Sequence, residues 1–293
     1  MEKQMKKLHF KELLKKYNLL FLLLFFVIVA TIVSKDFFSI NNFMNILRAY
    51  AAPGVIAIGM TFVVLTGGID LSVGSLAALA GMISGICLIN DTSVFVAVTA
   101  SVLSGVVLGT ITGILVTKFE LPAFIASLAV MVAGRGLTLL TTNGGVISGL
   151  IKLGKGGVVG KAFNFLGNGY ILGIPFAGVT WIALTLLSAY VLKYTLFGRS
   201  LYAIGGNRES AFLSGIRINL YNTLVYTISG ALAAYSGVML TAWLTVAQPT
   251  LGNGAELDAI AATVLGGTSL SGGTGGVLGT FGGVVLLLSL IHI

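Results

Sequence analysis

Long apolar runs separated by short polar stretches dominate this chain. The apolar runs long enough to cross a bilayer cover 17–33, 49–69, 71–90, 92–117, 121 to about 142 (interrupted by Arg135), roughly 169–192, 218 to about 246, a stretch from near Glu256–Asp258 into the glycine-rich 266–276, and a last run from Val277. A membrane-spanning helix needs about 20 predominantly apolar residues. The pattern therefore predicts an all-α, polytopic integral membrane bundle of about nine spans, in which glycines interrupt some helices.

Composition agrees with a membrane protein. Of the 293 residues, 56% are hydrophobic and only 9% are charged, whereas a soluble domain carries about 25% charged residues. The mean hydropathy is +1.03. The 40 glycines fit close approach between membrane helices. These values exclude ordinary soluble enzymes.

The net charge of +8 does not indicate nucleic-acid binding, because its distribution follows membrane topology. Six of the 17 basic residues lie between Lys3 and Lys16, ahead of the first apolar run. With the N-terminus inside, cytoplasmic segments hold eleven basic residues and outer loops hold five. This bias predicts a cytoplasmic N-terminal segment, 1–16, followed by one transmembrane domain, 17–293, with a long cytoplasmic loop at 193–219.

An acidic residue interrupts the apolar pattern. From 49 to 90, Asp70 is the only side chain expected to be charged at neutral pH. A carboxylate at bilayer depth costs roughly 2.5–3.5 kcal/mol. Two interpretations are compatible: Asp70 belongs to a solute pathway, or it caps the helix beginning at Leu71. Its neighbours Gly68, Ser72 and Gly74 are candidate pathway or hinge residues, since glycine lets the backbone break there.

The segment around Asp70 has a second, similar copy. Residues 67–74 match 266–273 at five of eight positions, and Val-Leu precedes both segments. Glycine-interrupted repeats are typical of transporters, so Gly267 and Ser269 join the pathway candidates. The alternative is chance similarity between glycine-rich and serine-rich stretches. Arg135, inside the fifth run, either lines a cavity or is held structurally, by pairing or by snorkelling to the outer headgroups.

The cytoplasmic loop 193–219 predicts a short helix outside the bilayer. Asn207 is placed to cap it, and Glu209 in its first turn suits the positive end of the helix dipole. Phe212, Leu213 and Ile216 are expected to share one face. The helix therefore either docks into a groove of a soluble partner or lies flat on lipid headgroups.

The chain lacks the residues for its own energy source. It has no phosphate-binding Gly-x-x-x-x-Gly-Lys-Ser/Thr motif and no metal-ligand cluster. We therefore expect no catalytic residues, no metal and no cofactor in this chain. An ion-coupled transporter is an alternative, but it would use intramembrane carboxylates, for which Asp70 is the main candidate.

Several long segments carry a family resemblance. They are Gly-Ile-Asp-Leu-Ser-Val-Gly-Ser at 68–75, Ala-Phe-Ile-Ala-Ser-Leu at 123–128, Thr-Asn-Gly at 142–144, Leu-Tyr-Ala-Ile-Gly-Gly-Asn at 201–207, Leu-Ser-Gly-Ile at 213–216, Ala-Gln-Pro-Thr at 247–250, and Glu-Leu-Asp-Ala-Ile-Ala-Ala-Thr-Val-Leu-Gly-Gly-Thr-Ser-Leu at 256–270. In these segments the chain resembles the permease subunits of bacterial ATP-binding-cassette importers for monosaccharides, most closely the ribose type. Permeases for xylose, galactose and signalling sugars share much of this sequence.

The resemblance implies partners and a location. Permeases of this kind have about ten spans, work as dimers in the bacterial plasma (inner) membrane, and receive sugar from an extracytoplasmic binding protein. A pair of cytoplasmic ATPase domains, which bind ATP and Mg²⁺, drives them. The resemblance places Asn143 among the pathway candidates and implies that this chain ends before a tenth span. The residues implied to dock into the ATPase are Gly205, Gly206, Asn207, Arg208, Glu209, Phe212, Leu213 and Gly215.

Overall fold

The structure, a computed structural model, describes residues 28, 31–32, 39–154 and 157–291. The predicted cytoplasmic segment 1–16 and nearly all of the first predicted span lie outside the described residues. The long helices are α3 (Ile40–Leu65), α4 (Val73–Ile89), α5 (Val94–Thr117), α6 (Ala123–Leu140), α8 (Phe176–Tyr194), α11 (Ile218–Leu244) and α13 (Val277–Ile291). The shorter ones are η1 (Leu150–Lys152), α7 (Val158–Asn168), α9 (Leu196–Gly206), α10 (Arg208–Leu213) and α12 (Ala255–Leu265).

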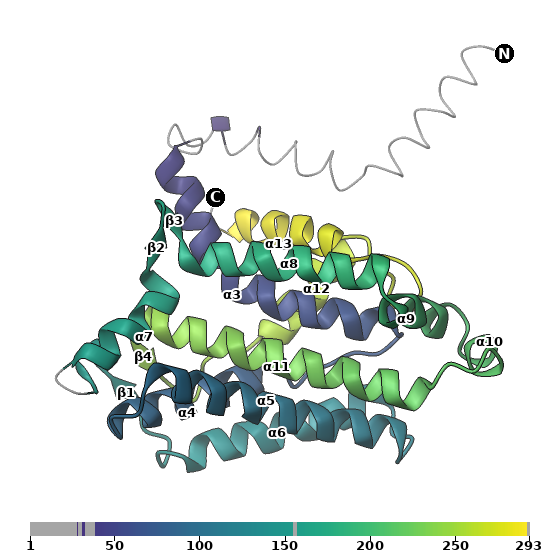
Figure 1. The fold of residues 1–293 in the computed structure, drawn as a ribbon, viewed down its shortest axis with the longest axis horizontal. Coiled ribbons are helices and arrows are strands. Elements are labelled where there is room, and N and C mark those ends of the chain that lie inside the picture. The colour runs from purple at the N-terminus through teal and green to yellow at the C-terminus, as the bar shows by residue number, and fades with distance from the viewer. Residues whose placement is uncertain (1–27, 29–30, 33–38, 155–156, 292–293) are drawn as a thin grey trace.

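Two small antiparallel strand pairs accompany the helices. β1 (Ile147–Ser148) pairs with β4 (Val246–Ala247), and β2 (Tyr170–Ile171) pairs with β3 (Ile174–Pro175). Both pairs lie at one end of the bundle, which we call the hairpin end, while α9 and α10 lie at the other, the α10 end (Figure 1).

Helix α11 lies at the centre of the bundle. It packs against α5, α4 and α3, and α8 covers α3 on one side while α6 covers α4 and α5 on the other (Figure 1). Small residues set the closest contact: a methyl group on Gly105 of α5 would overlap the backbone of Gly230 on α11. Such glycine contacts let the two backbones approach closely, which is how membrane helices gain packing energy.

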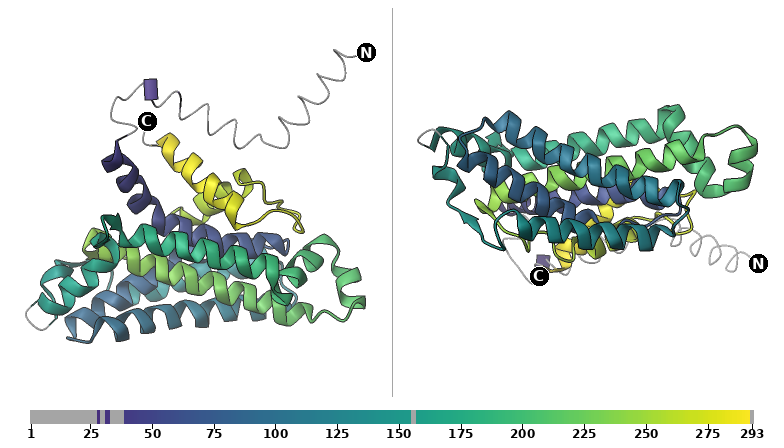
Figure 2. Two further views of the ribbon diagram at one scale, coloured as in Figure 1. Left: turned by 45° about the horizontal axis from the view of Figure 1, so that its top comes forward. Right: turned by 90° about the horizontal axis from the view of Figure 1, so that it is seen from below.

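Helix α3 is the most enclosed of the helices α3, α5, α6, α8 and α11, which are long enough to span a bilayer. Over its most apolar window 78% of the residues are buried, against 22% for α5. Ser39 caps it, accepting a hydrogen bond from the backbone N–H of Asn42 at 3.1 Å. Pro53 lies inside the helix, where it has no N–H to donate and its ring crowds the preceding turn. Figure 2 shows the first part of α3 standing at an angle to the remainder, which a proline explains.

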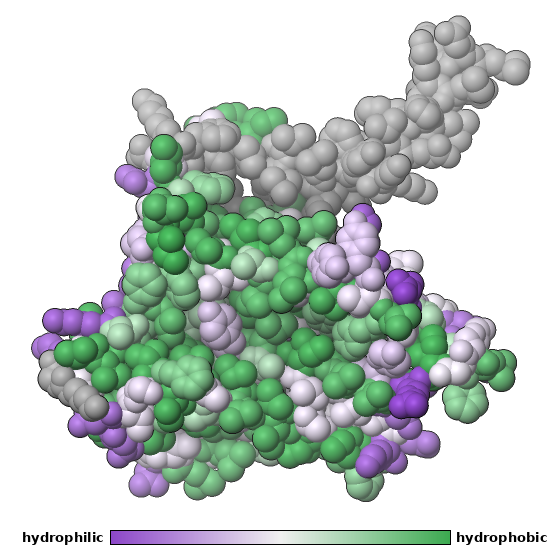
Figure 3. Space-filling view, in the orientation of Figure 1, coloured by the Kyte–Doolittle hydropathy of each residue, from purple (hydrophilic) through white to green (hydrophobic). Residues whose placement is uncertain are grey.

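The outer surface is that of a membrane protein. Within the part of the chain that the structure describes, five helices are long and apolar enough to cross a bilayer: α3, α5, α6, α8 and α11. Large hydrophobic side chains on α5, α6 and α8 are exposed, including Val107, Val132 and Leu186. Figure 3 shows hydrophobic side chains over the middle of this face and hydrophilic ones gathered towards its two ends. The predicted all-helical membrane bundle is confirmed.

Four predicted segments differ from the structure. The expected eighth span is the 11-residue helix α12, which at 1.5 Å per residue reaches only about 16 Å and cannot cross a core of about 30 Å. The connection 143–168 between the fifth and sixth predicted spans contains α7, and the predicted cytoplasmic loop 193–219 contains α9 as well as α10. The sixth run begins with the β2–β3 hairpin, because Gly173 turns the chain with a φ of +82° before α8 starts.

Candidate functional site

Two interrupted helices begin facing one another inside the bundle. The starts of the two helices lie very close together: a methyl group added to Gly74, in the first turn of α4, would overlap the carbonyl oxygen of Gly252. The same methyl group would lie 2.6 Å from Oε2 of Glu256, in the first turn of α12. We call this meeting point the helix junction. Discontinuous helices whose N-termini meet near the bilayer midplane are a common architecture of transporter sites.

Asp70 lies at the helix junction and is completely buried. Its Oδ1 accepts hydrogen bonds from the backbone N–H of Ser72 at 3.0 Å and from the Ser72 hydroxyl at 2.6 Å. Its Oδ2 accepts from the hydroxyl of Ser229 at 2.8 Å. The first pair closes an Asx turn before α4, which begins at Val73 with Ser72 at its N-cap position, so Asp70 is not the cap of a helix beginning at Leu71. The third bond ties this turn to α11.

The depth of Asp70 follows from its partner. Ser229 is eleven residues beyond Ile218, the first residue of α11, and a helix rises 1.5 Å per residue. Asp70 therefore lies about 16 Å along a helix about 40 Å long. The loop 66–72 enters the bundle from the α10 end instead of turning at its surface. Ser229 was not among the sequence candidates, and its place in an apolar helix gave no signal for it.

Arg135 is held by backbone on the other side of the helix junction. Its Nη1 donates hydrogen bonds to the carbonyl oxygens of Pro249 and Leu251, the latter at 3.1 Å, and the Glu256 carboxylate attracts it electrostatically. The side chain thus crosses from α6 to the turn before α12. This geometry corresponds to the structural pairing considered for Arg135.

Each of the two similar segments contains the end of a helix, and the two helix ends have the same geometry. The residues that correspond in the structure differ by one position from those that the sequence match paired. Gly67 after α3 and Gly267 after α12 both have left-handed backbones, with φ of +77° and +86°. At the end of α3, the Gly67 N–H donates to the Val64 carbonyl and the Gly68 N–H donates to the Val63 carbonyl. The same two bonds form at the end of α12, between the corresponding residues of the second segment. This ending requires a residue with positive φ after the helix, which glycine supplies at no steric cost. Gly67 therefore corresponds to Gly267, whereas the sequence match paired it with Gly266.

Both helix endings contact the end of α9. The backbone N–H of Gly273 donates to the Leu65 carbonyl at 3.0 Å, which joins the loop after α12 to the end of α3. A methyl group on Gly205 would overlap both of these groups. Tyr202, one turn earlier on α9, donates its hydroxyl to the Gly275 carbonyl at 2.8 Å, and partial burial raises the pKa of this phenol. We call this three-way contact the glycine contact.

Helix α10 follows directly and projects from the bundle (Figure 1). Asn207 caps it by accepting from the Ser210 N–H at 2.8 Å, as the sequence predicted. Phe212 and Leu213 are 69% and 78% exposed. Ile216 does not share their face: Gly215 ends the helix with φ +79°, and Ile216 turns inward to pack with Ile204, Ala211 and Ile218.

The remaining sequence candidates lie apart from the helix junction. Asn143 is an exposed residue at the hairpin end, with φ +51°. Gly267 and Ser269 lie at the α10 end, where the Ser269 hydroxyl accepts from the Ser271 N–H at 3.2 Å. The structure therefore brings Asp70, Ser72 and Gly74 together with the loop that Arg135 holds, and it does not bring Asn143 to them.

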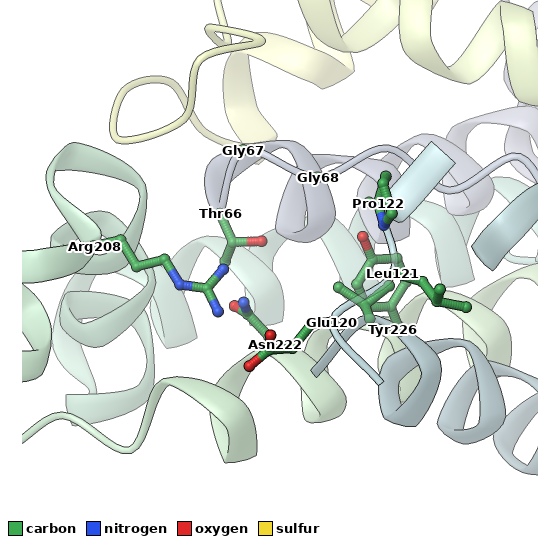
Figure 4. A pocket seen from close by; sticks show the side chains of 11 residues that line it. Thr66, Gly67, Gly68, Glu120, Leu121, Pro122, Arg208, Asn222 and Tyr226 are labelled. Carbon is green, nitrogen blue, oxygen red and sulfur yellow. The ribbon is translucent and has the colours of Figure 1, made fainter. Parts of the chain in front are cut away.

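A polar cavity opens at the α10 end and leads towards the helix junction. Its volume is about 440 Å³, and Figure 4 shows Arg208 reaching across it towards Asn222, with Glu120 and Tyr226 nearby. The lining residues are Thr66, Gly67, Gly68, Val116, Glu120, Leu121, Pro122, Ala123, Arg208, Asn222 and Tyr226. Of the sequence candidates only Gly68 and Arg208 line it. Over the residues that the structure describes, no three His, Cys, Asp or Glu side chains gather as metal ligands.

Comparison with known proteins supplies the family. Residues 42–291 match the family described as "Branched-chain amino acid transport system / permease component". The chain is 42% identical to the ribose import permease of Bacillus subtilis, over 98% of this chain and 87% of that protein. It is 43% identical to the ribose import permease of Escherichia coli K12, over 94% and 84%.

A more distant relative is the L-arabinose ABC transporter permease of Azospirillum brasilense, 31% identical over 92% of this chain and 76% of that protein. No solved structure gives a significant match. A family match over most of the chain, together with relatives above 40% identity along nearly its whole length, is sufficient to place it. The chain belongs to the permease family of bacterial ATP-binding-cassette sugar importers.

Proposed function

We propose that this chain is the membrane-spanning subunit that moves a monosaccharide, ribose first, across the bacterial plasma membrane. The observation that carries the proposal is the similarity to a ribose import permease, 42% identity over 98% of the chain, a range that includes the interrupted helices as well as α10. Xylose, galactose or a signalling sugar is the alternative cargo. In this proposal the chain is a translocation subunit without catalytic residues or a cofactor of its own.

The proposal includes three protein partners. A pair of cytoplasmic ATPase domains hydrolyses ATP with Mg²⁺, a sugar-binding protein delivers cargo from outside, and a second permease copy completes the channel. The N-terminus lies in the cytoplasm, which puts the α10 end on the same side as the ATPase. The two exposed side chains Phe212 and Leu213 on a capped helix support docking at α10, because exposed apolar side chains on a helix suit a hydrophobic groove.

The glycine contact suggests how docking affects the pathway. Gly205 touches the ends of both interrupted segments, and the loop after α3 continues directly to Asp70. A displacement of α9 and α10 by the ATPase would therefore be transmitted to the loops 66–72 and 266–276. Gly68, Asp70, Ser72 and Gly74 act in this proposal as the moving part of the pathway, and Arg135 fixes the opposite wall.

The test is ATP-driven uptake by the reconstituted complex. Proteoliposomes contain this chain, its ATPase and its binding protein, and labelled ribose, xylose and arabinose are compared. We expect uptake that requires ATP and favours ribose. Uptake that persists without the ATPase and follows an imposed ion gradient would instead support an ion-coupled transporter.

Docking is tested by a double variant with a matched control. Phe212→Ala with Leu213→Ala is expected to insert normally but to lose ATPase pull-down and uptake by at least tenfold. The control is Leu172→Ala at the hairpin end, where the leucine is 98% exposed but far from α10. The docking assignment is wrong if the double variant still binds the ATPase as well as the control does.

A further inference from the structure

In the wall of the α10-end cavity, two buried polar groups have no hydrogen-bond partner among the residues that the structure describes. They are Oδ1 of Asn222 and the hydroxyl of Tyr226, whose residues are 5% and 1% exposed. Both belong to α11, are one turn apart, and line the cavity. A buried polar atom without a partner costs about 1–3 kcal/mol, so a membrane protein that keeps two in one cavity is suited to a ligand that supplies the missing bonds.

The position of the Tyr226 hydroxyl is set by tight packing. A methyl group on Gly68 would overlap this hydroxyl, so the phenol lies directly against the loop that leads to Asp70. Ser229, which donates to Asp70, is three residues further along the same helix. The inner part of the cavity is therefore separated from the helix junction by about one turn of α11.

The rim of the cavity carries one charge of each sign. Glu120 and Arg208 are both exposed and line the opening, so they add no net charge to it. Figure 4 shows the Arg208 side chain directed towards Asn222 and Glu120. An opening without net charge does not concentrate anions or cations, whereas a ligand with several hydroxyls meets donors and acceptors together.

We infer that this cavity is a binding site for a neutral polyhydroxylated molecule of the size of a pentose, held by Asn222 and Tyr226 at the α10 end of the permease. One sugar hydroxyl donates to Oδ1 of Asn222, and another exchanges a hydrogen bond with the Tyr226 phenol. Glu120 and Arg208 bind the outer hydroxyls. The volume of about 440 Å³ is within the roughly 300–1,000 Å³ of small-molecule sites.

The identification of the ligand as a sugar rests on the proposed function. The cavity adds to that function a second place at which the cargo binds. Cargo that has passed the helix junction would stop in this cavity before it leaves the protein. Accumulated sugar on the α10 side would also rebind there and slow further transport. Occupancy of the cavity would thus depend on the internal sugar concentration, and it would affect the loop that contains Gly68 and Asp70.

Binding of tritiated D-ribose to the full chain in lipid nanodiscs tests the inference. Tyr226→Phe removes only an unpartnered hydroxyl, so it is expected to leave the melting temperature unchanged or higher while weakening ribose binding about tenfold, as the loss of one hydrogen bond predicts. Asn222→Leu is expected to weaken it as much or more. The matched control is Thr241→Val, which removes another buried unpartnered hydroxyl of α11 away from the cavity. It is expected to bind within twofold of the unaltered chain.

Three results would overturn the inference. The first is the absence of saturable ribose binding, and the second is equally strong binding by Tyr226→Phe and Thr241→Val. The third is displacement of ribose by L-leucine, which would mean that the two charges at the rim bind a zwitterion. ATP-driven uptake by the whole complex is measured in parallel. Failure of uptake with intact binding contradicts the proposed function, and intact uptake without binding at Asn222 and Tyr226 contradicts only this site.

Discussion

Alanine at Gly205 should damage the protein, while alanine at the next residue should not. A methyl group at Gly205 would lie 1.9 Å from the Leu65 carbonyl oxygen and 2.4 Å from the Gly273 nitrogen. Ordinary contact begins near 3.4 Å, so the two loops would have to move by about 1.5 Å. A methyl group at Gly206 meets nothing within 4 Å.

The expected magnitudes separate the two variants. Overpacking at Gly205 costs about 1–3 kcal/mol, and breaking the bond between Gly273 and Leu65 adds roughly 0.5–1.5 kcal/mol. Alanine in a helix gains about 1 kcal/mol over glycine, and this gain applies at both positions. We therefore expect Gly205→Ala to be less stable than Gly206→Ala by about 2–4 kcal/mol.

Thermal unfolding of both variants in the same detergent, followed by size-exclusion chromatography, measures this difference. ATP-driven uptake is then compared at equal amounts of folded protein, and we expect Gly205→Ala to lose most of it. Equal melting of the two variants, or lower stability of Gly206→Ala, would refute the reasoning, because the only structural difference is what the added methyl group meets.

Two further predictions concern the helix junction. Asp70→Ala should lower the free energy of unfolding by about 2–4 kcal/mol, since it leaves three buried donors without an acceptor. Asp70→Asn should lose less than half of that because the amide oxygen still accepts from Ser72 in the turn before α4; equal losses would contradict this role in the turn. Arg135→Ala should speed hydrogen exchange in 248–254 about tenfold or more while leaving α5 unchanged, because the Pro249 and Leu251 carbonyls lose their donor; unchanged exchange in that loop would show that Arg135 does not hold it.

Local signals allowed much of the helical framework to be predicted. Long apolar runs located α4, α5, α6 and α11 to within a few residues, and Asn207 marked the start of α10 through its own side chain. Such features depend only on neighbours in the chain, so a single sequence contains them.

Long-range contacts were not predictable in the same way. The apolar run after 218 covers helix, turn and helix alike, so hydropathy alone did not reveal that α12 is half a span. The Asp70 partner Ser229 is 159 residues away, and its serine has many equivalents in this serine-rich and threonine-rich chain. Asn222 and Tyr226 were missed for a related reason, because what distinguishes them is that they lack a hydrogen-bond partner among the described residues, which only the folded structure reveals.

The short length of α12 has a consequence for what can surround this protein. The segment 247–254 runs beside α4, from Ala247 near Gly85 to Gly252 near Gly74, as non-helical chain within the bundle. Peptide groups of such a chain cannot face hydrocarbon, since lipid offers them no hydrogen bonds. Ala247, Pro249 and Leu251 are buried, but Thr250 and Asn253 are exposed on its outer side. That side of the molecule must therefore meet water or another protein, whereas the exposed apolar side chains of α5, α6 and α8 suit contact with lipid tails.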